Sequence, residues 1–206
     1  RVPLGQKLAV GAGGFPIQNG GLIVQYMAQP IFQIFLGLNP ALFGLAMTIP
    51  RIWDAFTDPV MGRISDRSQS RYGRRRPYVF VGALAVALTF LTIWMVPQSM
   101  GDTGTFLWLT IGSVLFFTAF TVFSVPFNAL VYEQTPDYHE RTRLMFYLAL
   151  FYNIGNLCVN WYVPATNWSG FENPLVGARW IALGLALVVF LGMGILPAIF
   201  GKERFY

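Results

Sequence analysis

Cysteine, histidine and charged residues are all scarce in this 206-residue chain. Cys158 is its single cysteine and His139 its single histidine. One cysteine excludes a disulfide framework, and so few soft ligands argue against a zinc site. Charged residues make up 11% of the chain, whereas soluble domains carry about 25%. The chain therefore has too little charge to cover a globule in water.

Apolar residues are abundant instead, at 55% of the chain, and the mean hydropathy is +0.52. They form six stretches of about 20 residues or more, the length that a helix needs to cross hydrocarbon. The stretches are 7–36, 40–64, 77–96, 105–132, 144–164 and 176–201. Since lipid cannot satisfy backbone groups, such spans must be helices. The sequence predicts an all-α membrane protein with six transmembrane helices, forming one bundle over residues 1–206.

The net charge of +5 is concentrated in two predicted loops. The loop between the second and third stretches holds six arginines, and the loop between the fourth and fifth adds Arg141 and Arg143. Loops rich in Lys and Arg remain in the cytoplasm. This predicts a multi-pass protein of the cell membrane with both termini cytoplasmic. The charge is thus a topology signal rather than a nucleic-acid site, and the basic loops could contact membrane lipids.

The second stretch contains charges that lipid does not solvate. Arg51, Asp54 and Asp58 stand at i, i+3 and i+7, so a helix places them on one face. An ionisable group at bilayer depth costs about 2.5–3.5 kcal/mol on insertion scales, so we expect this face to look at protein or at a wet cavity. The three charges leave one negative charge, which suits Na⁺ or a proton, and Na⁺ prefers oxygen ligands. The alternative is a structural ion-pair cluster, with Asp58 capping a helix broken at Pro59.

Hydroxyl and amide side chains on other stretches are candidates for the same path. Thr121 and Ser124 lie one turn apart and could complete a cation shell, or could bond back to their own helix. Glutamines follow one face of the first stretch, and asparagines follow one face of the fifth. Such amides either line a solute path or hold helices together. The candidates for the solute path are Gln18, Gln25, Gln29, Asn128, Asn153 and Asn156.

Three segments of the chain also carry a family pattern. They are 51–59 (RIWDAFTDP), Gly62 with 66–77, and 125–130 (VPFNAL) with the following Glu140 and Arg141. These segments closely resemble the glycoside–pentoside–hexuronide:cation symporters, the melibiose permease-like branch of the major facilitator superfamily. The resemblance covers essentially the whole chain and implies the amino-terminal six-helix half of that fold, with its 3+3 repeat. The segment 11–18 also resembles the start of lysolipid-carrying animal relatives.

The resemblance implies a role for each motif. Asp54 and Asp58 would bind the coupling Na⁺ or H⁺, with Arg51 near the outer gate, and no other cofactor is implied. A cytoplasmic charge network would lock the outward-facing state. Its implied members are Gly62, Asp66, Arg67, Arg74 and Arg141.

The implied function is cation-coupled symport of a sugar or glycoside-like solute by alternating access. The sugar-holding positions of the melibiose permease-like branch align with Pro16, Ser124, Asn128 and Ala149, none of which is charged. The solute could therefore be a different glycoside or a lysolipid-like amphipathic molecule. Because a major facilitator cavity lies between two six-helix halves, we expect a carboxy-terminal half or a second chain as a partner.

Other classes of function are less compatible with the sequence. A membrane scaffold subunit that keeps the symporter fold without transport is the main alternative. An intramembrane enzyme is disfavoured because no stretch places a histidine beside serine, cysteine or a carboxylate. A channel is disfavoured because no ring of like charges is visible.

Overall fold

The structure is a computed structural model that describes residues 2–68, 70–71 and 73–201. Residues 1, 69, 72 and 202–206 of the predicted bundle lie outside this description. Within the described residues every regular element is helical, and two segments, η1 and η2, are wider π-helices. The elements are α1 (Leu4–Ala12), α2 (Gly14–Ala28), η1 (Gln29–Phe35), α3 (Pro40–Arg67), α4 (Arg76–Trp94), α5 (Asp102–Tyr132), α6 (Tyr138–Thr166), α7 (Pro174–Leu185), η2 (Ala186–Met193) and α8 (Gly194–Phe200).

These elements follow the six predicted stretches in order, and the all-α fold class is confirmed. The first stretch is divided into α1, α2 and η1, and the last into α7, η2 and α8. By length and composition, three helical runs of the described chain could cross a membrane: α4, α5 and Pro174–Phe200. The other three predicted spans are helical but more polar; α3, for example, carries three aspartates and three arginines. Six spans therefore remain a prediction.

Short polar residues determine where several helices begin. Asn39 accepts a hydrogen bond from the Ala41 backbone N–H at 2.8 Å, and Pro40 takes the first helical position of α3. Asp137 caps α6 in the same way through His139 N–H at 2.9 Å. Asn173 caps α7 through Val176 N–H, also at 2.9 Å. Such caps satisfy N–H groups that have no partner inside the helix.

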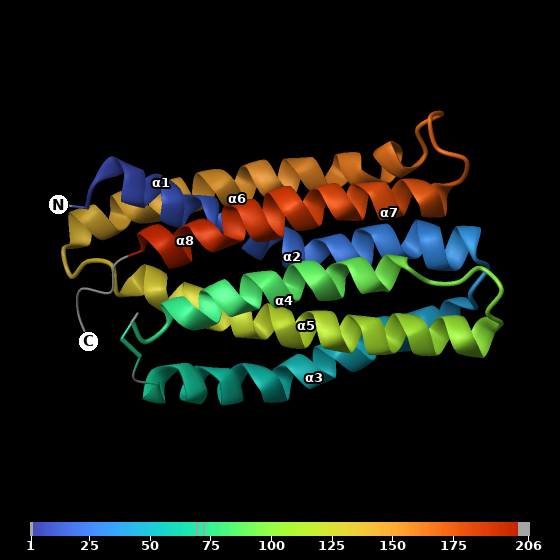
Figure 1. Cartoon of the computed structure of the whole chain (residues 1–206), viewed down its shortest axis with the longest axis horizontal. Helices are drawn as coiled ribbons and strands as arrows, with labels where there is room; N and C mark the ends of the chain where they lie inside the picture. Colours follow the sequence, from blue (N-terminus) through green and yellow to red (C-terminus); the bar gives the residue numbers. More distant parts are fainter. Residues whose placement is uncertain (1, 69, 72, 202–206) are drawn as a thin grey trace.

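The long helices lie side by side in one bundle (Figure 1). α5 packs along both α3 and α4, while α6 packs along α1 and α2. α3 occupies an edge of the bundle, and apart from its contact with α5 most of its side chains are exposed. α1 begins and α8 ends at the same end of the bundle, on the left in Figure 1. The α3–α4 and α5–α6 connections lie at that end too, and most of the arginines stand in these connections or within a few residues of them.

Glycines allow the helices to approach closely. A Cβ on Gly82 of α4 would lie 2.7 Å from the backbone of Phe123 in α5, and one on Gly20 of α2 would lie 2.1 Å from the Phe120 ring. Lipid tails are as apolar as leucine, so burial of apolar side chains does little to hold membrane helices together. Close contact of backbones, with its dispersion energy, does this instead. The aromatic core of α4, α5 and η2 forms around such contacts, for example Phe90 with Phe190 at 5.3 Å between ring centroids.

We expect Gly82→Ala to lower the stability of the bundle. The added methyl group meets backbone atoms, which cannot turn aside, and overpacking of this kind costs about 1–3 kcal/mol. Gly184→Ala in α7 is the matched control, because a Cβ there meets nothing within 4 Å. Thermal unfolding in detergent should show a lower Tm for G82A and an unchanged or higher Tm for G184A. Equal Tm values for the two variants would contradict this packing.

A buried ion pair anchors the first helix to the start of α6. Lys7 Nζ lies 2.7 Å from Glu140 Oε2, and both side chains are at most 10% exposed. Glu140 also accepts from the Val2 backbone N–H at 3.2 Å and pairs with Arg143 Nη1 at 3.2 Å. Lys7, Glu140 and Arg143 are called the Glu140 cluster below. Beside it, the Gln6 side chain donates to the Gln134 side chain, which is fully buried.

The Glu140 cluster should make stability depend on pH in the acid range. Glu140 precedes the predicted fifth span, and its hydrogen bond with Lys7 lowers the pKa of its carboxyl from 4.5 to about 2. A lowered carboxyl pKa contributes stability that is complete above the unfolded-state value and is lost as pH falls toward the folded-state value. We therefore expect the Tm to fall between pH 4.5 and 2, measured by thermal unfolding. Glu140→Gln should flatten this interval, and an equally steep fall in E140Q would refute the assignment.

Candidate cation site and charge network

α3 brings the three predicted intramembrane charges onto one face. Arg51, Asp54 and Asp58 all lie within its unbroken run, near the middle of the helix. Pro50 and Pro59 lie inside the same helix. A proline has no N–H, so Pro59 leaves the Ala55 carbonyl without its usual partner one turn later. The Ala55 carbonyl oxygen and the two aspartate carboxylates therefore lie along the same turns of α3.

One of the two aspartates, Asp58, meets a hydroxyl group of the neighbouring helix α5. Thr121 Oγ1 donates to Asp58 Oδ1 at 2.8 Å, so this hydroxyl does not bond back to its own helix. Asp54 Oδ1 is buried and has no hydrogen-bond partner among the described residues. A buried polar atom without a partner is rare in folded proteins and calls for an explanation. Two carboxylates one turn apart and a threonine hydroxyl form an oxygen-only set of the type that binds a hard cation.

Other α5 residues have different relations to this site. One turn earlier, Trp53 Nε1 donates to Thr118 Oγ1 at 2.9 Å and ties α3 to α5. Ser124 is half-buried, and within the described chain no hydrogen bond joins it to either aspartate. Asn128 is exposed, one turn beyond. Of the predicted hydroxyls, Thr121 is thus the one that touches the acidic pair.

Arg51 points toward other helices rather than pairing with the aspartates. Its Nη2 donates to the Gly21 carbonyl of α2 at 3.0 Å, and its guanidinium lies 4.8 Å from the centroid of the Phe117 ring in α5. Among the described residues no ion pair joins it to Asp54 or Asp58. The arginine thus links α2, α3 and α5 just above the acids. Within the described chain, neither carboxylate is therefore in direct contact with this guanidinium.

The predicted amides lie on the open sides of α2, η1 and α6. Gln25 of α2, Gln29 of η1, and Asn153 and Asn156 of α6 are exposed, and Gln18 is half-buried. Asn153 Nδ2 donates to the Ala149 carbonyl of its own helix at 2.7 Å rather than to another helix. A Cβ on Gly155 of α6 would lie 3.6 Å from the Gln18 Cβ, so the two stripes are neighbours.

Asn19 is the amide that joins α2 to α6, and the stripe pattern did not single it out. It is fully buried, accepts from the Tyr162 hydroxyl at 2.7 Å and donates to the Phe15 carbonyl at 3.0 Å. Its position beside Gly20 in a run of small residues was the available signal. A buried amide bonded through both its oxygen and its nitrogen holds helices together.

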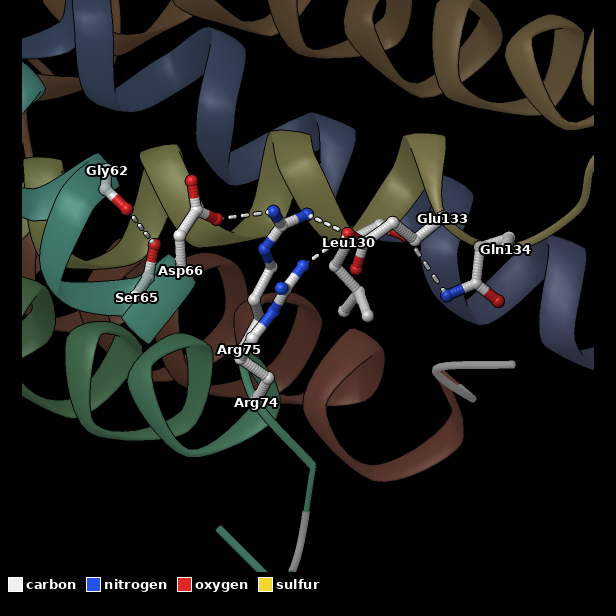
Figure 2. A network of polar contacts seen from close by, with 8 residues as sticks. All are labelled: Gly62, Ser65, Asp66, Arg74, Arg75, Leu130, Glu133 and Gln134. Atoms are coloured by element: carbon white, nitrogen blue, oxygen red, sulfur yellow. Dashed lines mark hydrogen bonds and ion pairs between the residues drawn. The ribbon is translucent and has the colours of Figure 1, made fainter. Parts of the chain in front are cut away.

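A charge network lies at the end of the bundle where α1 begins (Figure 2). Arg75 pairs with Asp66 at 2.6 Å and with Glu133 at 3.0 Å, and Arg74 pairs with the same Glu133 oxygen at 2.5 Å. The network thus joins the end of α3, the start of α4 and the end of α5. Sequence reasoning named Asp66 and Arg74 but missed Arg75 and Glu133. Arg75 lies among consecutive loop arginines, and nothing in the sequence distinguishes it from them. Glu133 directly follows the fourth stretch, and no motif marks it.

The other predicted members of this network lie around it. The Gly62 carbonyl accepts from the Ser65 hydroxyl at 3.0 Å, and a Cβ on Gly62 would lie 3.9 Å from Val125 Cγ1 of α5. Arg67 ends α3 and is exposed. Arg141 donates to the Thr135 carbonyl at 3.4 Å, so it braces the α5–α6 connection rather than the Glu133 group.

Glu133 should matter more to stability than Asp66. It accepts from two arginines with 21% of its side chain exposed, whereas Asp66 is 57% exposed and faces one. Loss of a partly buried partner costs about 1–3 kcal/mol, and loss of an exposed one costs less than about 1 kcal/mol. Thermal unfolding should give a lower Tm for E133Q than for D66N. The reverse order would contradict the central position of Glu133.

Comparison with known proteins identifies a matching family and several similar proteins. Residues 9–204 match the family described as MFS/sugar transport protein. An uncharacterized symporter of Synechocystis, sll1374, is 35% identical over 67% of this chain and 26% of its own. The sodium-dependent lysophosphatidylcholine symporter 1-A of Danio rerio is 31% identical over 66% of this chain and 25% of its own. In Escherichia coli, YagG, whose name proposes glycoside/cation symport, is 27% identical over 91% of this chain and 40% of its own.

This chain therefore spans about a quarter to two fifths of the length of these relatives. The match to the family covers nearly all of its described helices. The relatives are named as symporters, and the apolar helices found here are those of an integral membrane protein. The chain belongs to the MFS/sugar transport protein family, within the cation symporters of the melibiose permease-like branch.

Proposed function

We propose that this chain forms the amino-terminal six-helix half of a cation-coupled symporter, and that Asp54, Asp58 and Thr121 bind the coupling cation. The observation that carries the proposal is the unpaired, buried Oδ1 of Asp54 beside an Asp58 that accepts a hydroxyl from α5. Side chains at i and i+4 of a helix have Cβ atoms about 5–6 Å apart, so one small cation can touch both carboxylates. Either Na⁺ or a proton would relieve the repulsion between them.

Cation binding would be coupled to movement through the helix contacts of the site. The acids sit on α3, while Thr121 sits on α5, and Arg51 connects both to α2. A bound cation draws α3 and α5 together and removes negative charge from the cavity wall. The cost of closing a wet cavity around solute is thereby lowered, because fewer charges must leave water.

The solute would bind along the exposed amides of α2 and α6. Gln25, Gln29, Asn153 and Asn156 offer uncharged hydrogen-bond donors and acceptors on neighbouring helices. Such a lining suits a hydroxyl-rich solute, and the proposed substrate class is a glycoside. A lysolipid is the second candidate, because one relative is named as a lysophosphatidylcholine symporter and Tyr26 of α2, next to Gln25 in the sequence, is 49% exposed.

The full transporter would need further helices to close this cavity. The relatives are two to four times as long as the matched region, and α3 exposes one long side in this bundle. We therefore infer a second six-helix unit, in the same polypeptide or in a partner chain. The arginine-rich end of the bundle would face the cytoplasm, with both termini of this half on that side. The charge network around Glu133 would then lie at the inner gate.

Asp54→Asn and Asp58→Asn should each abolish Na⁺ stimulation of solute uptake. Each change removes one of the two carboxylates, and Thr121→Val should weaken stimulation by about tenfold through loss of one oxygen ligand. Uptake of radiolabelled glycosides and of lysophosphatidylcholine into proteoliposomes, with and without Na⁺, is the measurement. Asp102→Asn, which removes an exposed acid at the start of α5, is the control and should behave as wild type.

Binding of the cation itself gives a second readout. At constant pH, Na⁺ should raise the Tm of the wild type by mass action, and D54N and D58N should lose that shift. Undiminished stimulation of uptake in both variants would overturn the cation site. Absence of both uptake and cation-dependent stabilisation in the wild type would favour a scaffold without transport.

A further inference from the structure

The Glu140 cluster borders a pocket that the proposed transport does not use. The pocket has a volume of about 490 Å³ and lies between the start of the chain and the first turns of α6. Two cations and four apolar or aromatic side chains line it: Val2, Leu4, Lys7, Arg143, Phe146 and Tyr147. Leu4 is 59% exposed and Phe146 is 63% exposed, so the pocket opens on the outer surface of the bundle.

The charge around this pocket is positive. Both carboxylate oxygens of Glu140 already have partners: Oε2 pairs with Lys7 and accepts from the Val2 N–H, and Oε1 pairs with Arg143. Two cations face this one carboxylate, which leaves one positive charge. Arg143 places this positive charge at the surface, since 63% of its side chain is exposed. A guanidinium retains further N–H donors after one ion pair, and its planar fork matches a phosphate.

An apolar strip of α6 leads away from Arg143 into the membrane. Residues at i, i+4, i+7, i+11, i+14 and i+18 share one face of a helix. From Arg143 this face runs through Tyr147, Leu150, Ile154, Leu157 and Trp161. Leu150, Ile154 and Leu157 are 44%, 41% and 68% exposed. Asn153 and Asn156 lie about 80° and 140° around the helix from the centre of this strip, so both amides face mostly away from it.

We propose that the pocket and this strip bind one anionic phospholipid, with its phosphate on Arg143 and Lys7 and an acyl chain along α6. From Arg143 to Ile154 the helix rises by roughly 16 Å, which is half of a hydrocarbon core of about 30 Å. One acyl chain of one leaflet has this reach. Arg143 stands at the boundary where a headgroup lies, one residue before the predicted fifth span, and the apolar strip continues where the chain lies.

A bound lipid would also strengthen the anchor of the first helix. Its phosphate adds a second anion to a cluster in which Lys7 of α1 and Arg143 of α6 share one carboxylate. The lipid would thereby link α1 to α6 at the end of the bundle that holds the basic loops. This role does not depend on which solute or cation the protein carries.

The test uses the full-length protein in phosphatidylcholine nanodiscs, with native mass spectrometry to count retained phosphatidylglycerol molecules. We expect one tightly retained phosphatidylglycerol and a higher Tm as its fraction rises. Arg143→Gln, an exposed position that should fold normally, should weaken this binding about fivefold, since one basic residue near the surface contributes on that scale. Arg63→Gln is the matched control, because it removes one exposed arginine on α3 outside the pocket, and its effect should stay below about twofold.

A phosphatidylglycerol with a photoreactive group in the acyl chain tests the strip directly. Labelling should fall on residues 146–157 in the wild type and in R63Q, and should be lost in R143Q. Equal weakening in R143Q and R63Q would overturn the site and indicate a diffuse attraction to basic loops. Stabilisation by inorganic phosphate alone, or labelling confined to other helices, would also overturn it. Na⁺ stimulation in D54N does not bear on phospholipid binding, so the phospholipid site and the proposed cation site can be refuted independently.

Discussion

An ionised carboxylate is stable in a membrane protein only if other groups replace the water it has lost. α3 places Asp54 and Asp58 near the middle of a long helix, where lipid offers no such groups. Thr121 of α5 supplies part of the replacement, because its hydroxyl donates to Asp58. The contact of α3 with α5 thus gives Asp58 a hydrogen-bond donor, whereas the buried Oδ1 of Asp54 has none among the described residues. This unfilled position supports the proposed cation site.

The same requirement explains the ion pairs at the end of the bundle where α1 begins. Arg75 pairs with Glu133 where α3, α4 and α5 meet, and Lys7 pairs with Glu140 where α1 meets α6. Each ion pair joins elements that are far apart in the sequence. Along the helices, close contact depends on glycines such as Gly20 and Gly82, because lipid competes with every apolar side chain. Ion pairs at one end and close contacts at glycines along the helices together hold the bundle.

The helices could be predicted from the sequence because lipid imposes a simple rule. A run of about 20 apolar residues in a membrane must become a helix, and each predicted stretch is helical in the structure. The division of the first and last stretches was not predicted. Pro30 removes one backbone donor within η1, but the apolar pattern passes through it without a break. α3 is long enough to cross a membrane, but its composition is too polar for it to be counted among the candidate spans. Six spans therefore remain a prediction.

Within the site, the sequence by itself determined which residues share a face of one helix. Arg51, Asp54 and Asp58 follow from a period of 3.6 residues, and so do the amide stripes. Only the tertiary structure decided which partner each side chain has. It turned Arg51 toward Gly21 and Phe117, gave Thr121 rather than Ser124 to Asp58, and joined Lys7 to Glu140 over 133 residues of chain. Helical periodicity is a local property of the backbone, whereas the partner of a charge depends on which helices pack together, and no pattern within one helix contains that information.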